Sequence, residues 1–167
     1  MGFLDKLRGR TDDQGEPGRD EPAAVAQVDD DEATGIAAVD EIGTRRLTAD
    51  EEVALDAVRA GYAAHGIDPG DLASVAAAYD RALADAADED ASALVELLGT
   101  AVGDHHVAVG GYRWVVSTDP FGTDLAVEPP RRGVPVVPRM LGAVRWMSRE
   151  QGWMPGVVGH LARIGRS

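Results

Sequence analysis

Hydrophobic positions repeat at a helical period through the middle of the chain and predict three consecutive helices. They cover about residues 48–65, 68–84 and 91–106, because apolar residues three or four positions apart share one helix face. The positions that make these apolar stripes are Leu55, Val58, Tyr62, Leu72, Val75, Tyr79, Leu83, Leu94, Leu97, Leu98 and Val102.

Local signals support these helix boundaries. Thr48 and Glu51 have the spacing of a capping box, in which each side chain bonds the other residue's backbone amide. Asp68 before Pro69 suits the start of the second helix. Gly99 and Gly103, four residues apart on the third helix, are expected to let another backbone approach closely.

The hydrophobic period then changes from 3.6 to 2, which predicts an antiparallel hairpin over about residues 112–128. Its turn, residues 119–122, has the Asp-Pro-x-Gly pattern typical of a type I turn. We expect the helices to cover one sheet face, formed by Trp114, Val116, Leu125 and Val127. Residues 134–137 are expected to add a third strand at an edge, because Pro135 cannot donate a ladder hydrogen bond.

Two helices are predicted near the C-terminus. The first, residues 139–150, is expected to place four apolar side chains inward, those of Met140, Leu141, Val144 and Met147. The second, about residues 155–164, is expected to bury Val157, Val158, Leu161 and Ile164. Together these elements predict an α+β fold, with three helices, a small antiparallel sheet and C-terminal helices.

The chain is expected to have three parts. Residues 1–9 form a short amphipathic segment, and residues 10–45 read as a disordered acidic linker without an aromatic residue or a periodic apolar pattern. Residues 46–167 are expected to form one α+β domain, which is also what a chain of 167 residues accommodates.

Charge is concentrated in the front of the chain. Residues 1–90 carry 23 of the 29 acidic residues and 8 of the 16 basic ones, whereas the remainder is close to neutral. Such acidity argues against binding to nucleic acid or to anionic lipid, which need clustered Lys and Arg. No stretch approaches the roughly 20 apolar residues of a membrane span, so stable membrane insertion is not expected. With no export signal and no cysteine, we expect a cytoplasmic protein.

Few residues suggest catalytic or metal chemistry. Asp104, His105 and His106 place a carboxylate beside two imidazoles, but adjacent residues on a helix diverge by about 100° and do not converge on one ion. We expect His105 to be half-buried and His106 to be exposed. No Cys-based zinc site and no phosphate-binding loop are present. The sequence therefore predicts no cofactor, no metal and no catalytic residue.

Arginines after the hairpin are the best candidates for an interaction surface. They are Arg131, Arg132, Arg139 and Arg145, with Trp146 and Trp153 nearby. Guanidinium and indole groups are enriched where proteins bind partners. These arginines could hold an anionic ligand or a partner's acidic face, or they could pair with the acidic helices of the same molecule, which is the interpretation we favour.

The segment from Leu98 to Trp146 resembles an uncharacterised bacterial family, the domain-of-unknown-function family 3806. The residues that carry the resemblance are Leu98, Gly99, Gly103, Asp104, the strand Tyr112–Val116, Asp119, the stretch Gly122–Val127, Pro138, Arg145 and Trp146. It covers about residues 47–155. The resemblance implies a small α+β fold and supplies neither an activity nor a catalytic residue.

Three function classes remain open from the sequence. The leading hypothesis is a non-enzymatic interaction or adaptor domain, homodimeric or bound to another protein, since a small sheet with free edges gains from pairing. The alternative is a small-ligand-binding or regulatory domain that uses the Arg/Trp surface. An enzyme is the third, and a pocket holding Asp104, His105 and an arginine would favour it.

Overall fold

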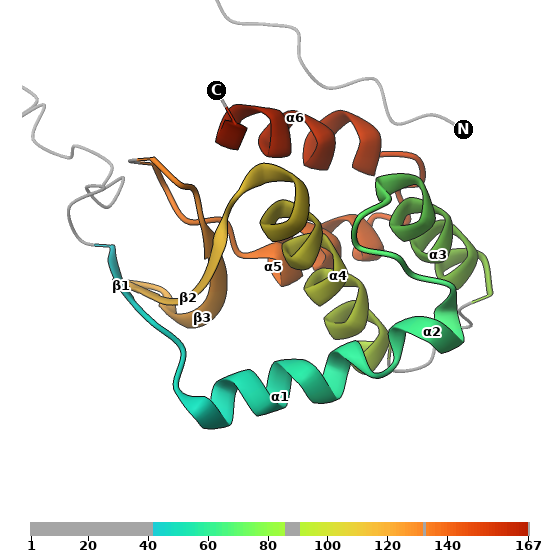
Figure 1. The fold of residues 1–167 in the computed structure, drawn as a ribbon. Helices are drawn as coiled ribbons and strands as arrows, with labels where there is room; N and C mark the ends of the chain where they lie inside the picture. Colours follow the sequence, from blue (N-terminus) through green and yellow to red (C-terminus); the bar gives the residue numbers. More distant parts are fainter. Residues whose placement is uncertain (1–41, 86–90, 132, 167) are drawn as a thin grey trace, which may run out of the picture. The chain divides into compact units, whose positions relative to one another are not determined.

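A computed structural model describes residues 42–85, 91–131 and 133–166 (Figure 1). The chain divides into two units, residues 1–34 and 35–167, and every described residue belongs to the second. Its elements are β1 (Gly43–Arg45), α1 (Ala49–Arg59), α2 (Tyr62–His65), α3 (Leu72–Asp85), α4 (Ser92–Gly110), β2 (Arg113–Asp119), β3 (Gly122–Glu128), α5 (Pro138–Met147) and α6 (Met154–Arg166). The α+β class is confirmed: α1 to α4 precede the β2–β3 hairpin along the chain, and α5 and α6 follow it.

The first expected helix is broken into α1 and α2. The predicted capping box is present, since Glu51 N–H donates to Thr48 Oγ1 and Thr48 N–H donates to the Glu51 carboxylate. The break comes at Gly61, where a Cβ atom would lie 3.0 Å from Leu97 Cδ1 of α4. α2 then ends at Gly66 in a left-handed conformation, as expected for a glycine C-terminal cap.

α4 is the central element of the fold. It contacts α1, α3, α5, α6 and both long strands, and Figure 1 shows it between the sheet and α3. The predicted close approach at Gly99 is confirmed, because a Cβ atom there would lie 2.7 Å from Arg139 Cα at the start of α5. Gly103 instead accommodates the indole of Trp114, so its neighbour is a side chain rather than a backbone.

The sheet has three antiparallel strands in the order β1-β2-β3. The hairpin is confirmed, with Asp119 opposite Gly122 at its turn and the Asp119 carboxylate accepting from the amides of Phe121 and Gly122. The third strand, however, is β1, which pairs with β2 and lies within the segment expected to be a linker. Residues 134–137 contribute only one bridge, between Val136 and Val127.

Burial in the sheet is not restricted to one face. Val116 and Val127 on the expected inward face are buried, but so are Val115 and Ala126, which pair with each other on the opposite face. The prediction that the helices cover a single face is therefore incomplete. Residues 1–41, which include the expected amphipathic segment and most of the expected acidic linker, lie outside the described residues.

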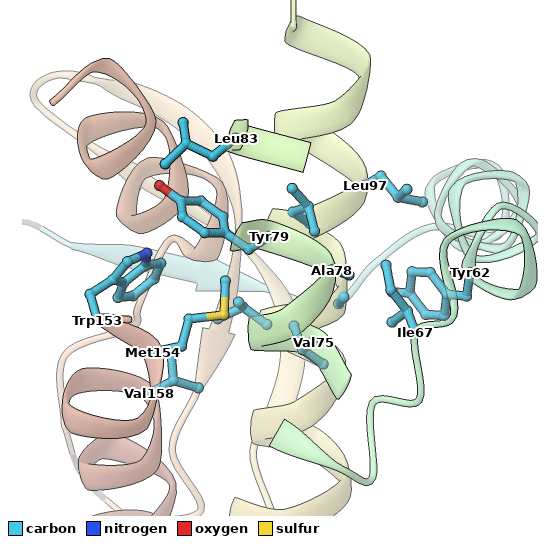
Figure 2. Packing of buried hydrophobic residues seen from close by; sticks show 13 residues of the cluster. Tyr62, Ile67, Val75, Ala78, Tyr79, Leu83, Leu97, Trp153, Met154 and Val158 are labelled. Atoms are coloured by element: carbon cyan, nitrogen blue, oxygen red, sulfur yellow. The ribbon is translucent and has the colours of Figure 1, made fainter. Parts of the chain in front are cut away.

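The main hydrophobic core lies between α3, α4 and the start of α6 (Figure 2). Tyr79 is 1 % exposed and meets two indoles edge-on, Trp146 at 5.8 Å and Trp153 at 5.7 Å between ring centroids. Edge-to-face aromatic pairs add to the stabilisation from burial alone. Of the residues expected inward on the last helix, Val158 is buried, whereas Ile164 is exposed.

Candidate functional site

Arg139 and Arg145, two of the predicted interaction residues, lie on α5 and have different partners. Arg139 is exposed and its Nη2 lies 2.9 Å from Asp124 Oδ1 on β3. Arg145 is half-buried, and its guanidinium carbon lies 4.7 Å from the ring centroid of Trp153. Its Nε is 3.8 Å from Glu150 Oε2. Both arginines therefore contact groups of the same molecule, although Glu150 and Asp124 are not on the N-terminal helices.

Of the other two predicted arginines, one is among the described residues. Arg131 is exposed in the loop after β3, and Arg132 lies outside the described residues. The contacts of Arg139 and Arg145 have no residue in common among those that the structure describes. Arg139 and Arg145 therefore lie in different surroundings and do not point to one shared ligand site.

Asp104 accepts hydrogen bonds from three other elements, and we call this group of side chains the hub. The sequence placed Asp104 beside the histidines but did not indicate these partners. Its carboxylate accepts two hydrogen bonds from Arg59, at 2.8 and 2.6 Å, and one from Tyr62 Oη at 2.8 Å. Trp114 Nε1–H donates a fourth at 2.8 Å. One side chain on α4 is therefore bonded to α1, α2 and β2, and its side chain is 12 % exposed.

Electrostatics agree with an ionised carboxylate at this hub. Burial raises the pKa of Asp104, but hydrogen bonds from Arg59, Trp114 and Tyr62 together lower it by more, so that it lies below its usual value. The hydrogen bond to Asp104 raises the pKa of Arg59. Burial and the Asp104 charge raise the pKa of Tyr62. All three groups are thus held in their ordinary protonation states at neutral pH, which suits a structural role.

His105 and His106 are both buried, so the expectations of a half-buried His105 and an exposed His106 are wrong. His106 is 0 % exposed and its Nδ1–H donates to the Val102 carbonyl at 2.7 Å. His105 Nδ1–H donates to the Pro69 carbonyl at 2.8 Å. His106 Nε2 has no hydrogen-bond partner among the described residues. Burial lowers the pKa of His106, outweighing the opposing effect of its bond to Val102.

Acid should destabilise the fold through His106. Its folded-state pKa lies below that of the unfolded chain, so the unfolded state takes up a proton first as the pH falls below about 6.5. We therefore expect this residue to make the protein less stable at pH 5.5 than at pH 7.5. His106→Asn should remove that pH-dependent part, whatever its effect at pH 7.5. Urea denaturation at both pH values measures this, with the exposed His160→Asn as control. An unchanged pH dependence in His106→Asn would show that another group is responsible.

α5 presents an exposed apolar stripe, which we call the α5 stripe and define as Met140, Val144 and Met147. Their exposed fractions are 50 %, 50 % and 77 %. The spacing of four and three residues places them on one helix face. These residues were expected to point inward, and that prediction is wrong. Only Leu141 of the four predicted residues packs against the core.

The orientation of α5 explains this exposure. Its inward face carries Trp146, which packs on Tyr79 of α3, and the buried Gly142 and Pro138. Because Trp146 is the largest apolar side chain on this helix, its burial against the aromatic core fixes the rotation of α5 and turns the stripe outward. The sequence signal for this orientation is the indole itself, whose burial cannot be combined with four inward side chains on the opposite side of the helix.

The structure adds two observations on other site classes. No helix of the described residues combines the length and the hydropathy that crossing a membrane requires. Within the same residues, no group of three or more His, Asp or Glu side chains is arranged to hold a metal ion.

Comparison with known proteins identifies a family for this chain. No curated protein and no solved structure matches the chain. The family described as a domain of unknown function, DUF3806, matches residues 71–156, just over half of the chain. The match runs from α3 to the start of α6, so it includes Asp104, Trp114 and the α5 stripe but not Arg59 or Tyr62. It begins later than the expected residue 47 and ends close to the expected residue 155. The chain is therefore a member of the DUF3806 family.

Proposed function

We propose that this protein is a non-enzymatic interaction domain that associates with a second copy of itself through α5. The observation that carries the proposal is the exposure of the α5 stripe, in which three large apolar side chains share one helix face. The solvent-facing side of a helix ordinarily carries polar residues. A contiguous apolar surface of this kind marks an interaction site more often than a monomer surface does.

The composition of the stripe suits docking against another helix. Two of its three members are methionines, whose flexible thioether side chains adapt to irregular apolar surfaces. α5 is also held from behind, because Trp146 and Leu141 pack against the core. A partner would therefore meet a helix already fixed in orientation, and association would order few additional groups.

A second copy of α5 matches the stripe better than an arbitrary partner. Met140 lies four residues before Val144 and Met147 lies three residues after it, so the stripe is nearly symmetric about Val144. In an antiparallel pair related by a two-fold axis, Val144 would lie near the axis and Met140 of one copy would face Met147 of the other.

Charges at the ends of α5 agree with this arrangement. Arg139 at the start of the helix and Glu150 just after its end have side chains that are 56 % and 52 % exposed. Within one copy Arg139 pairs with Asp124 and Glu150 lies 3.8 Å from Arg145. Antiparallel pairing would bring Arg139 of one copy toward Glu150 of the other, so that these ion pairs would extend across the interface. Arg149 also lies at this end, and its guanidinium is held against α3 by a hydrogen bond to the Leu83 carbonyl. Opposite charges at both ends favour the antiparallel register over the parallel one.

The contacts of the acid–base residues also favour binding over catalysis. Both oxygens of Asp104 are occupied by Arg59, Tyr62 and Trp114. The ring of His105 is bonded to the backbone of Pro69. Asp104 and His105, which would have suggested an enzyme, therefore form hydrogen bonds that hold α4 against its neighbours.

Polar replacement of the stripe should weaken self-association without unfolding the protein. Val144→Thr and Met147→Gln keep side-chain volume while removing apolar surface. We expect the doubly substituted chain to dimerise at least about tenfold more weakly, because a symmetric interface carries each change twice. Sedimentation equilibrium across a concentration series measures this.

The matched control is Val53→Thr, which replaces an apolar residue on α1 that is 67 % exposed. It should leave both association and stability unchanged, since surface substitutions usually alter stability by less than about 0.5 kcal/mol. A wild-type protein that stays monomeric at every concentration would contradict the proposal. A dimer that tolerates the α5 changes would place the interface elsewhere.

A further inference from the structure

A second site, separate from the α5 stripe, lies where the hairpin meets α4 and the start of α5. It is a cavity of about 240 Å³. Its apolar walls come from Trp114, Val116 and Leu125 of the hairpin and from Pro138 of α5. The volume is slightly below the roughly 300–1,000 Å³ of typical ligand sites, so it suits a small ligand or one inserted side chain. We call it the hairpin cavity.

The close packing of α4 and α5 shapes one side of the hairpin cavity. Gly99 of α4 lines it and has Arg139 Cα so close that a Cβ atom at Gly99 would lie 2.7 Å away. Thr100 follows Gly99 on α4, is 6 % exposed and also lines the cavity. The wall is therefore built of backbone and short side chains held by tertiary packing, which gives the cavity a defined shape.

The rim of the hairpin cavity carries three carboxylates and one guanidinium. Asp124 and Arg139 form an ion pair with each other. Glu51 is paired with Arg45 through two hydrogen bonds, at 2.8 and 2.7 Å. The side-chain hydrogen bond from Arg45 lowers the pKa of Glu51 to about 2, so this carboxyl stays ionised.

Glu96 is the remaining charge on the rim. It is exposed on α4 and forms no hydrogen bond or ion pair with the residues that the structure describes. With the Asp124–Arg139 and Glu51–Arg45 pairs each neutral, Glu96 leaves the rim with one uncompensated negative charge. An apolar cavity with a free carboxylate at its mouth is complementary to a cation that has an apolar body.

We propose that the hairpin cavity binds an organic ammonium group carried on a short apolar body, with Glu96 as the counter-ion and Trp114, Val116 and Leu125 around the body. The indole of Trp114 adds a surface that attracts cations as well as apolar groups. The same chemistry is found in free aliphatic or aromatic amines and in a lysine side chain of another protein. The apolar walls of this site share no residue with the α5 stripe.

Titration of the full chain with three probes that share a phenethyl group tests the charge preference. Phenethylamine, 2-phenylethanol and 3-phenylpropionate differ mainly in the head group. We expect saturable shifts of the Trp114 indole and Leu125 methyl NMR signals with phenethylamine, at a dissociation constant on the order of 1 mM, an ordinary ligand efficiency for this size. The alcohol should bind more weakly and the carboxylate least. Equal or tighter binding of the carboxylate would make Arg139 the anchor and overturn the proposal, as would no saturation by about 20 mM phenethylamine.

Two substitutions test the role of Glu96. Glu96→Gln should weaken phenethylamine binding about five- to tenfold, the loss expected for one charge-assisted contact. Glu96→Arg should reverse the order, so that 3-phenylpropionate binds more tightly than phenethylamine. Glu52→Gln is the matched control, because Glu52 is an exposed carboxylate on α1 that does not line the cavity. An equal loss of phenethylamine affinity in Glu52→Gln would attribute the effect to the net charge of the protein and overturn the assignment of Glu96.

The source of the ammonium group is distinguished by a fourth probe, Nα-acetyl-lysine N-methylamide. Tighter binding of this probe than of phenethylamine would identify a protein lysine as the occupant, whereas the reverse would identify a free aromatic amine. Each titration is run at a protein concentration where sedimentation shows a single oligomeric state. Failure of self-association through α5 would then leave the outcome for the hairpin cavity unchanged.

Discussion

Asp104→Asn is expected to lower the free energy of unfolding by about 3 kcal/mol, which would make it one of the two most damaging substitutions considered. The change removes the charge that pairs with Arg59 and replaces one acceptor oxygen with a donor facing Arg59, Tyr62 or Trp114. Breaking one side of a buried pair ordinarily costs about 3–5 kcal/mol, and the partial exposure of Arg59 places this case at the lower end. Urea denaturation at pH 7 measures the loss.

Asp56 provides a matched control for Asp104. It contacts the same guanidinium at 2.8 Å, but its side chain is 71 % exposed. Asp56→Asn should therefore cost less than about 0.5 kcal/mol, as expected for an exposed ion pair. A double-mutant cycle between Asp104→Asn and Arg59→Met should give a coupling of about 1–3 kcal/mol. Equal effects at Asp104 and Asp56 would show that the hub contributes nothing beyond surface charge.

The hub also predicts a second acid transition, separate from that of His106. The pKa of Asp104 is lowered in the folded state. Its stabilising contribution is therefore fully present above the unfolded value near pH 4 and is lost as the pH falls through the folded value. Asp104→Asn should abolish this low-pH loss while leaving the change between pH 7.5 and 5.5 in place.

Asp104 was a candidate from the sequence, but its structural role could not be predicted. The residue was noticed for its adjacency to His105 and His106, whereas its partners Arg59 and Tyr62 lie 45 and 42 positions earlier in the chain. Pairing over such a separation depends on how α1 and α2 pack on α4, which no local pattern encodes. The same packing buries α4 on several sides, so its weakly one-sided pattern did not show that His106 would be enclosed.

The strands show the same division between local and tertiary information. The hairpin was predictable because its turn residues and its alternating apolar positions act within a few residues of one another. β1 was not predictable, because Gly43, Thr44 and Arg45 are all exposed and show no alternation. This strand exists only through its pairing with β2, with Thr44 Oγ1 also donating to Glu128 on β3 at 3.1 Å.

α5 was predicted as a helix but with the wrong face inward. Its sequence carries apolar residues around most of its circumference, so periodicity alone could not choose between the α5 stripe and Trp146. The choice is made by the edge-to-face contact of Trp146 with Tyr79 of α3, 67 residues earlier. Arg139 was a candidate from the sequence, but the cavity that it lines also needs Gly99 and the hairpin to lie beside it.

Trp114→Ala is expected to lower the free energy of unfolding by about 3–5 kcal/mol, the usual cost of truncating a packed aromatic side chain. The ring is confined against Gly103, where an added Cβ atom would collide with indole atoms Cζ2 and Cη2. Its Nε1–H also donates to Asp104. Trp114→Phe should cost less, because it keeps most of the apolar ring. Its remaining cost would come mainly from the lost hydrogen bond to Asp104. Denaturation of both variants measures the two contributions.

A second substitution, at Gly103, separates the packing contribution of the Trp114 indole from its hydrogen bond. In the wild-type chain, Gly103→Ala should cost about 1–3 kcal/mol, because its methyl group would overlap the Trp114 indole and lie 3.1 Å from Pro138 Cγ. In the Trp114→Ala background the space beside Gly103 is vacated, and alanine favours the helix by about 1 kcal/mol over glycine. The double variant should therefore be at least as stable as Trp114→Ala alone. Additive losses would mean that the indole does not occupy the space above Gly103 in solution, and the structural role assigned to Trp114 would be wrong.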